Sequence, residues 1–140
     1  MGITPVCDGL NFPFVMGITP YLYGKNEEDA LYACVILNSN QSKGYEGCSW
    51  SILCDDSEVL IPHALAVNPV FQRKGIGKIV VENILQVAKK KKKTVRLDVL
   101  YACKAAADLY TRCGFDFVEV KELYYDDTGW TACKLFERIL

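Results

Sequence analysis

Residues 67–78 read VNPVFQRKGIGK and join an apolar run to a segment of helical periodicity. It follows the nearly continuous apolar run EVLIPHALAV at residues 58–67, which is typical of a strand covered on both faces. It precedes residues 76–89, where apolar side chains recur at helical spacing. This order of strand, basic turn and helix places the unpaired amides of the helix N-terminus beside the turn. Those amides and the positive end of the helix dipole can bind an anion, so the stretch has the chemistry of a pyrophosphate-binding loop.

The side chains of the turn support phosphate binding, although its glycine spacing alone does not require it. Gly75 and Gly77 let a ligand approach the backbone with no Cβ in the way. The turn is neither a Walker loop nor a Rossmann turn, because Val80 stands where the Rossmann pattern needs a third glycine. Taken by itself, the G-x-G spacing is equally compatible with a plain structural turn. The neighbouring donors and positive charges are Gln72, Arg73, Lys74 and Lys78.

The remaining patterns predict a mixed α/β (α+β) fold. The first two expected strands form a hairpin-like pair, and strands 58–67 and 94–100 form a parallel pair because a helical crossover joins them. Pro62 cannot donate to a strand ladder, so we expect a bulge near it. Strands are expected at residues 30–38, 48–55, 58–67, 94–100, 115–125 and 130–140, and helices at 76–89 and 103–114.

Length and composition indicate a single domain over residues 1–140. The chain has 140 residues, of which 51% are hydrophobic, and this is enough for one core. Residues 1–28 are interrupted by three prolines and four glycines. We therefore expect an irregular or abbreviated N-terminal region there.

Charge and cysteine usage argue against several classes of protein. A formal net charge of −1 disfavours a nucleic-acid binder. The seven cysteines are scattered singly and only one histidine is present, so neither a disulfide framework nor a metal site is expected. No apolar stretch approaches the roughly 18 residues of a membrane span, and no signal peptide is visible. A cytoplasmic protein without membrane association is predicted.

Two motifs together carry a family resemblance. Val67, Pro69, Gln72, Gly75 and Gly77 fill the pattern Q/R-x-x-G-x-G/A that follows a V-x-P strand end. Downstream, LYTRCGF at residues 109–115 matches L-Y-x-x-x-G-F. The chain thus resembles the GNAT superfamily of N-acetyltransferases over about residues 29–140, most strongly from 58 to 118.

The resemblance implies a fold and a co-substrate. GNAT-like sheets are mixed and mostly antiparallel, with flanking helices and a splayed central parallel pair, here strands 58–67 and 94–100. Acetyl-CoA would lie between those strands, with no metal involved. Cys103 stands at a position where the family often has an asparagine that binds the cofactor arm, so the resemblance makes it a further cofactor contact. Loss of the asparagine amide would either weaken CoA binding or be replaced by backbone contacts. The contacts carried over are Leu65, Ala66 and Val67 for the pantetheine and thioester, and Gln72, Arg73, Lys74, Gly75, Ile76, Gly77 and Lys78 for the pyrophosphate.

The resemblance also implies direct attack of a neutral amine on the thioester. Tyr110 stands where many family members keep a tyrosine that protonates the departing thiolate, and a phenol with a pKa of about 10 suits that role. The alternative is an amphipathic core tyrosine. Strand alternation would place His63 on the same face as Leu65 and Val67, which makes it a candidate base. A buried structural histidine is the alternative.

The predicted activity is acetyl transfer to a primary amine of a small molecule, peptide or protein. The alternative is a CoA-binding or sensing module with weak or no catalysis, suggested by Cys103 and the short N-terminal part. That short part also predicts a homodimer, because it would leave a sheet edge and apolar surface to be covered.

Overall fold

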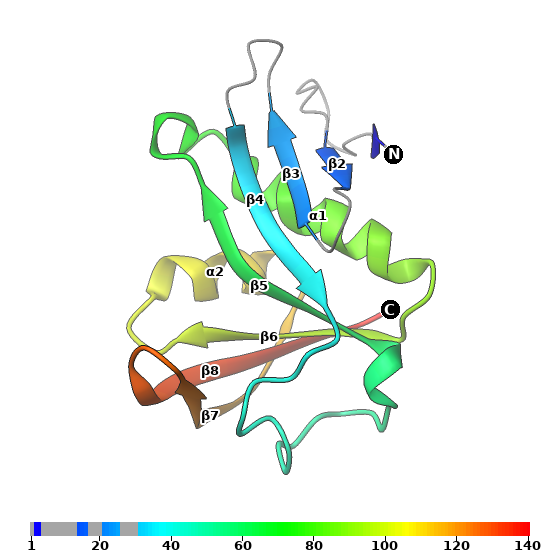
Figure 1. Ribbon diagram of the computed structural model, residues 1–140, viewed down its shortest axis with the longest axis vertical. Helices are drawn as coiled ribbons and strands as arrows, with labels where there is room; N and C mark the ends of the chain where they lie inside the picture. Colours follow the sequence, from blue (N-terminus) through cyan, green and yellow to red (C-terminus); the bar gives the residue numbers. More distant parts are fainter. Residues whose placement is uncertain (1, 4–13, 17–20, 26–30) are drawn as a thin grey trace.

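The computed structural model describes residues 2–3, 14–16, 21–25 and 31–140 (Figure 1). These residues form one eight-stranded sheet with the order β1-β2-β3-β4-β5-β6-β8-β7. Its elements are β1 (Gly2–Ile3), β2 (Phe14–Met16), β3 (Tyr21–Lys25), β4 (Leu31–Asn38), β5 (Val59–Val67), α1 (Ile76–Lys89), β6 (Thr94–Leu100), α2 (Lys104–Arg112), β7 (Asp116–Tyr125) and β8 (Gly129–Ile139). Two short 3₁₀ turns, η1 (Asp56–Glu58) and η2 (Pro69–Phe71), flank β5.

One parallel pair lies at the centre of this otherwise antiparallel sheet. β5 and β6 pair only at Val59 with Thr94 and at Leu60 with Val95. Beyond these pairs the strands diverge, and Figure 1 shows the arrows of β5 and β6 well separated at their tips. The predicted mixed sheet with a splayed parallel pair and flanking helices is confirmed.

A β-bulge in β5 reverses the alternation of its side chains. Cys34 of β4 lies opposite Ala66, and Ile36 lies opposite His63, so two residues of β5 face one residue of β4. Ala64, inside the bulge, has a φ of 52°, which is uncommon for a residue with a Cβ. Leu60 and Leu65 consequently pack on the same side of the sheet, although they are an odd number of residues apart. The bulge expected near Pro62 therefore lies slightly later in the strand.

Both helices cover one face of the sheet (Figure 1). α1 forms over the predicted residues, and its apolar side chains pack against those of β4, β5 and β6. Asn83, expected on the solvated side of this helix, is fully buried, and its Nδ2 donates to the carbonyl of Ile79 at 2.8 Å. α1 is thus enclosed on more sides than its periodicity indicated, because α2 and the sheet both contact it.

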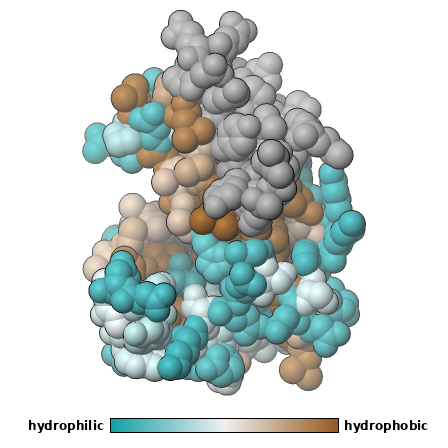
Figure 2. Space-filling view, viewed as in Figure 1, coloured by the Kyte–Doolittle hydropathy of each residue, from teal (hydrophilic) through white to brown (hydrophobic). Residues whose placement is uncertain are grey.

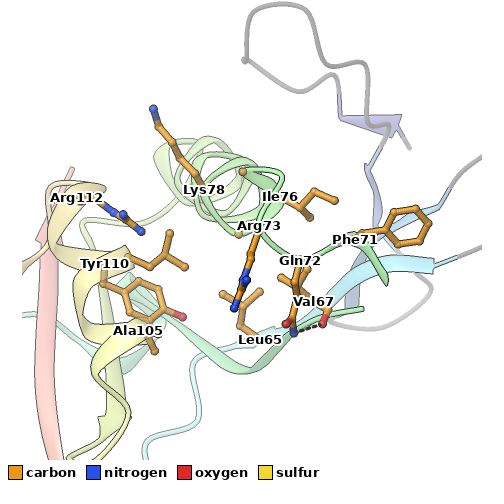
Figure 3. A pocket seen from close by; sticks show the side chains of 14 residues that line it. Leu65, Val67, Phe71, Gln72, Arg73, Ile76, Lys78, Ala105, Tyr110 and Arg112 are labelled. Atoms are coloured by element: carbon orange, nitrogen blue, oxygen red, sulfur yellow. Dashed lines mark hydrogen bonds between the residues drawn. The ribbon is translucent and has the colours of Figure 1, made fainter. Parts of the chain in front are cut away.

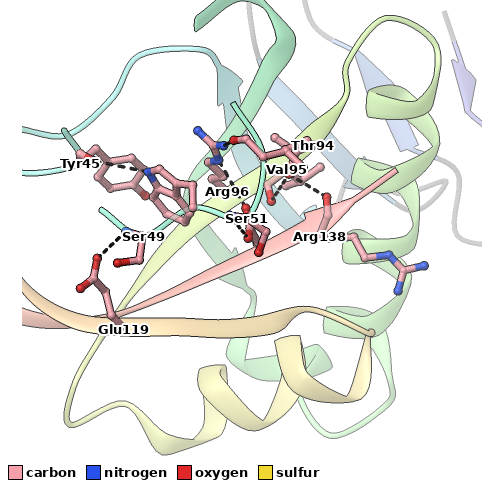
Figure 4. A network of polar contacts seen from close by, with 11 residues as sticks. Tyr45, Ser49, Ser51, Thr94, Val95, Arg96, Glu119 and Arg138 are labelled. Atoms are coloured by element: carbon pink, nitrogen blue, oxygen red, sulfur yellow. Dashed lines mark hydrogen bonds and ion pairs between the residues drawn. The ribbon is translucent and has the colours of Figure 1, made fainter. Parts of the chain in front are cut away.

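The opposite face is covered by the long connection between β4 and β5, residues 39–58. The strand predicted at residues 48–55 is wrong, since none forms there. Arg96 Nη2 donates to the carbonyl of Ile52 at 2.6 Å, and the amide of Ser51 donates to Glu137 Oε1 at 2.7 Å (Figure 4). These backbone groups are paired with side chains of β6 and β8 instead of a strand ladder.

Short strands occupy part of residues 1–28, the region predicted to be irregular or abbreviated. They are β1, β2 and β3, and β3 pairs with β4 from Tyr21–Ile36 to Lys25–Leu31. Pro13 and Pro20 directly precede β2 and β3, so neither strand contains a proline that would interrupt its ladder. The other residues of this range lie outside the described part of the chain.

Candidate cofactor-binding site

A pocket of about 570 Å³ opens where β5 and β6 separate (Figure 3). It is bounded by the end of β5, the turn that follows η2, the first turn of α1 and one side of α2. Its lining residues are Leu65, Val67, Phe71, Gln72, Arg73, Gly75, Ile76, Gly77, Lys78, Ala105, Ala106, Leu109, Tyr110 and Arg112.

The turn before α1 leaves backbone amides open to the pocket. Arg73 and Gly75 both have left-handed backbone conformations, with φ of 64° and 78°, and α1 begins directly after Gly75. Among the described residues no side chain caps this helix end, and its first intrahelical bond runs from the Ile79 amide to the Gly75 carbonyl at 3.2 Å. The preceding amides of the first turn thus remain available to an anion.

Positive charge surrounds these amides. Arg73, Lys78 and Arg112 line the pocket, and its lining contains no acidic residue. Lys78 is only loosely paired, at 3.9 Å from Glu82 on the next turn of the helix. Figure 3 shows the Arg73 and Arg112 side chains entering from opposite walls. The pocket therefore suits a ligand with several phosphate charges.

The two glycines of the turn have different roles. A Cβ on Gly75 would meet no atom within 4 Å, so its side of the helix end is open for a ligand. A Cβ on Gly77 would lie 3.1 Å from Leu109 Cδ2, so this glycine allows α1 and α2 to approach each other. One glycine exposes the backbone and the other sets the width of the pocket.

The structure brings most of the predicted cofactor contacts together. Ala66, Lys74 and Cys103 are the exceptions, because they do not line the pocket. Ala66 borders a separate hollow beside β4, Lys74 Nζ lies 5.6 Å from the Phe71 ring centroid, and Cys103 is exposed at the N-terminus of α2. The contacts that do line the pocket are Leu65, Val67, Gln72, Arg73, Gly75, Ile76, Gly77 and Lys78.

Sequence reasoning missed the wall contributed by α2. Ala105, Leu109 and Arg112 follow the spacing of one helix face, so this wall has a pattern in the sequence. The pattern alone does not say which face of α2 lines the pocket. The close approach of Gly77 to Leu109 shows that this face is the one turned toward α1.

Tyr110 lies inside the pocket, and its hydroxyl points toward the side of Leu65 (Figure 3). Its ring is buried beside Phe115 and Phe136, with centroids 5.5 and 6.4 Å away. Burial, followed by the negative charge of Asp98, raises the pKa of this phenol well above its ordinary value. The hydroxyl therefore stays protonated and can act as a proton donor.

His63 lies elsewhere. The bulge puts its side chain on the other face of β5 from Leu65 and Val67, so the alternation that grouped these residues does not hold. His63 does not line the pocket, and its Nε2 lies 2.8 Å from Asn38 Oδ1.

Residues 27–116 match the family model of the GNAT acetyltransferase domain. This chain belongs to the GNAT family. The predicted resemblance is thereby confirmed, and the pocket lies between the two motifs that carried it.

A curated relative and several solved structures agree with this assignment. An uncharacterized N-acetyltransferase of Methanocaldococcus jannaschii is 30% identical over 99 residues, covering 69% of this chain and 43% of that protein. The GNAT chain thus spans less than half the length of this relative.

Among solved structures, a GNAT family acetyltransferase from Elizabethkingia anophelis with acetyl-CoA bound has a TM-score of 0.66 at 18% identity, covering 86% of this chain and 75% of its own. A Bacillus subtilis acetyltransferase in complex with CoA has a TM-score of 0.64 at 16% identity, and the match covers 86% of this chain and 76% of the B. subtilis chain. The Escherichia coli ribosomal-protein-S18-alanine N-acetyltransferase has a TM-score of 0.62 at 20% identity, and the match covers 90% of this chain and 68% of the E. coli chain. At these identities the structures share the fold of this chain.

Two further observations concern the described part of the GNAT chain. None of its helices is long and apolar enough to cross a membrane. Its His, Cys, Asp and Glu side chains form no group of three or more that could hold a metal ion.

Proposed function

We propose that this GNAT domain transfers the acetyl group of acetyl-CoA to a primary amine of a small molecule, peptide or protein. The observation that carries the proposal is the pocket, which combines open helix-terminal amides, three cationic side chains and a tyrosine hydroxyl. Family membership supports acetyl transfer, and the structures from E. anophelis and B. subtilis contain acetyl-CoA and CoA.

The residues present fit the co-substrate. Its pyrophosphate would accept hydrogen bonds from the first amides of α1, with Arg73, Lys78 and Arg112 neutralising its charge. The pantetheine arm would follow Leu65 and Val67, where β5 no longer pairs with β6. Ala66 would contact it only through its backbone, because its side chain borders the hollow on the other side.

Acetyl-CoA supplies a thioester whose carbonyl carbon accepts a neutral amine while the C–S bond breaks. Tyr110 would donate its hydroxyl proton to the departing sulfur and regain one from solvent or from the amine. Its raised pKa keeps the proton on the phenol until a thiolate is present to accept it. His63 remains the proposed base. It lies beyond the last β5–β6 pair on the face opposite the helices.

A CoA-binding or sensing module is the second candidate. It is favoured by Cys103, which is exposed outside the pocket and so gives the cofactor arm no side-chain contact. CoA release with any amine distinguishes the two, because a sensing module would bind acetyl-CoA without releasing CoA.

The binding step is tested by the rise in melting temperature that acetyl-CoA produces by mass action. Gly75→Glu should abolish that rise, because a carboxylate at the open helix end would block and repel phosphate. Gly129→Glu is the matched control. Gly129 also has a left-handed φ, 73° compared with 78° at Gly75, and has open space around it, but it is the first residue of β8 and does not line the pocket. A rise that persists in Gly75→Glu would refute phosphate binding at this turn.

The reaction is tested by CoA release across polyamines, amino acids, aminoglycosides and peptide N-termini. We expect release with at least one class. Tight acetyl-CoA binding without release for any of them would favour the sensing module.

A further inference from the structure

His63 is the only histidine of the chain, and its imidazole contacts the side chain of Asn38. The ring is half-buried, and its Nε2 lies 2.8 Å from Oδ1 of Asn38, the last residue of β4. Asn38 lies opposite Ile61 and Ile36 lies opposite His63, so Asn38 and His63 are diagonal neighbours on one face of the sheet. Neither of the two GNAT motifs contains either residue.

A second contact determines which way the Asn38 side-chain amide points. The backbone amide of Asn40 donates to Asn38 Oδ1 at 2.9 Å. Because a backbone N–H can only donate, the atom that it meets must be the carbonyl oxygen of the side chain and not its nitrogen. The same oxygen faces His63 Nε2, and a carbonyl oxygen can only accept. The proton of that hydrogen bond therefore belongs to Nε2 of His63.

The position of this proton decides which ring nitrogen can act as a base. A neutral imidazole carries one proton, so a protonated Nε2 leaves the lone pair on Nδ1. Among the described residues, Asn38 is the one hydrogen-bond partner of the ring. Nδ1 is therefore free to take up a proton.

The chain around Asn38 is held in place by contacts of its own. Ser39 Oγ donates to the Val59 carbonyl at 2.7 Å, which ties the end of β4 to the start of β5. Lys92 Nζ, beyond the end of α1, donates to the same Ser39 Oγ at 3.2 Å. Asn38 thus presents its oxygen to His63 from an anchored strand end, which keeps the orientation of the ring defined.

His63 lies where β5 has already separated from β6. The last pair of these strands on β5 is at Leu60, and the bulge at Ala64 directly follows His63. In the space-filling view the surface is hollowed between the end of β5 and the lower part of the molecule (Figure 2). The Tyr110 hydroxyl lies in the pocket on the helix side of the same separation. Groups on both faces of the sheet can therefore approach a thioester held between the two strands.

We propose that Asn38 is a positioning residue that holds His63 with its proton on Nε2, so that Nδ1 removes the proton from the attacking amine. This inference rests on the proposed acetyl transfer. As the C–N bond forms and the C–S bond breaks, one amine proton passes to Nδ1 and Tyr110 protonates the sulfur. The imidazolium keeps its Nε2–H bond to the Asn38 carbonyl, which stabilises the new positive charge, and then releases the extra proton to solvent.

The tautomer is tested without any activity, by the imidazole nitrogen NMR signals of isotope-labelled protein. Because His63 is the only histidine, these signals belong to it. In the alkaline range, where an imidazole is neutral, Nε2 should give the signal of a protonated nitrogen and Nδ1 that of an unprotonated one. Asn38→Leu should move the two signals toward each other, because both tautomers are then populated.

Asn40→Leu is the matched control for this measurement. Asn40 contacts Asn38 through its backbone amide, and its own side chain is exposed, so the His63 signals should stay as in the unmodified protein. A protonated Nδ1 in the unmodified protein, or His63 signals that Asn38→Leu leaves unchanged, would overturn the inference.

The proton step is tested by CoA release with spermidine, alanine, kanamycin and trialanine, one acceptor from each class of the screen. Asn38→Leu should lower kcat about tenfold or more, as expected when a hydrogen bond to a charged group is lost, and should leave KM for acetyl-CoA unchanged. Asn38→Asp keeps an accepting oxygen and should restore most of the activity. Asn38→Ala repeats the test, and the melting temperature verifies folding of each variant.

A residue that acts through His63 should have no effect once His63 is absent. His63→Phe removes the base, so adding Asn38→Leu to it should cause no further fall in kcat. An equal additional fall with and without His63 would assign Asn38 a purely structural role and overturn the inference.

The two proposals fail differently. No CoA release with any amine refutes acetyl transfer and the proton step with it, while the NMR signals of His63 still decide the tautomer. CoA release at a kcat that neither Asn38→Leu nor His63→Phe changes refutes only the assigned base and its positioning residue.

Discussion

The two faces of the sheet at the splay are built by different kinds of interaction. On the helix-covered face, α1, α2 and the turn between residues 67 and 78 shape the pocket, and the contacts connect short, contiguous motifs. On the opposite face, the 39–58 connection contains no strand and is held by hydrogen bonds to Arg96 and Asp98 of β6 and to Glu137 of β8. The elements of the helix-covered face can be predicted from local sequence patterns. The opposite face depends on polar side chains that come into contact only after the sheet has formed.

The buried pair on the second face is unusual in how it uses its hydrogen bonds. Arg96 and Glu137 are 5% and 1% exposed, and Arg96 Nε lies 3.6 Å from Glu137 Oε2, an ion pair too long for a hydrogen bond. Their other polar atoms bind the backbone of Ile52 and Ser51, and the Arg96 guanidinium lies 4.7 Å from the Trp50 ring centroid (Figure 4). Arg96 and Glu137 therefore hold the 39–58 connection in place more than they link β6 to β8.

The largest effect is expected at Tyr110, on the helix-covered face. Tyr110→Phe keeps the ring packing but removes the proton donor, so kcat should fall about 100- to 10,000-fold, the usual contribution of a general acid. The melting-temperature rise with acetyl-CoA should be retained, because the phenol is not a phosphate contact. Unchanged turnover would leave Tyr110 as a core residue only.

The opposite face should respond most strongly to Glu137→Ala. We expect a loss of about 3–5 kcal/mol in the free energy of unfolding, because Arg96 would keep a buried charge without a counter-ion. Urea denaturation measures it, and Glu122→Ala, at an exposed position on β7, is the control, with an expected change within ~0.5 kcal/mol. A loss below ~1 kcal/mol would mean that the pair does not fasten the connection.

A smaller effect tests the contact between the two helices. Gly77→Val should cost about 1–3 kcal/mol of stability, because its Cβ would lie 3.1 Å from Leu109 Cδ2. Adding Leu109→Ala should reduce the cost of the glycine substitution, and a double-mutant cycle by urea denaturation measures the coupling. Additive costs would contradict the close approach of α1 and α2.

The smallest effect is expected at Arg112. Arg112→Ala should weaken acetyl-CoA binding about fivefold by calorimetry, since an exposed ion pair contributes up to ~1 kcal/mol. Lys91→Ala, in the exposed lysine run after α1, is the control and should bind acetyl-CoA normally. Equal affinities of the two variants would remove Arg112 from the phosphate contacts.

The sequence was most informative where neighbouring residues determine the geometry. The glycines at 75 and 77, the apolar periodicity after them and LYTRCGF predicted α1, α2 and most of the pocket lining. Each of these signals extends over one or two helical turns, so chain connectivity alone keeps its residues together. The homodimer and the cytoplasmic location remain predictions.

Prediction was wrong where a single residue or a distant partner changed the local pattern. One extra residue in the bulge of β5 moved His63 away from the face of Leu65, and alternation cannot reveal where such an insertion lies. The β-rich segment at 48–55 forms no strand, because Ser51 and Ile52 pair with side chains of β8 and β6.

The turn before α1, the parallel strand pair and the family could be predicted from the sequence, because their signals are contiguous and depend on backbone geometry. Only the tertiary structure placed Asp98, Tyr45 and Tyr125 together on the other face. These three residues are brought into contact by sheet pairing and by the fastened 39–58 connection, and no spacing along the chain records that contact.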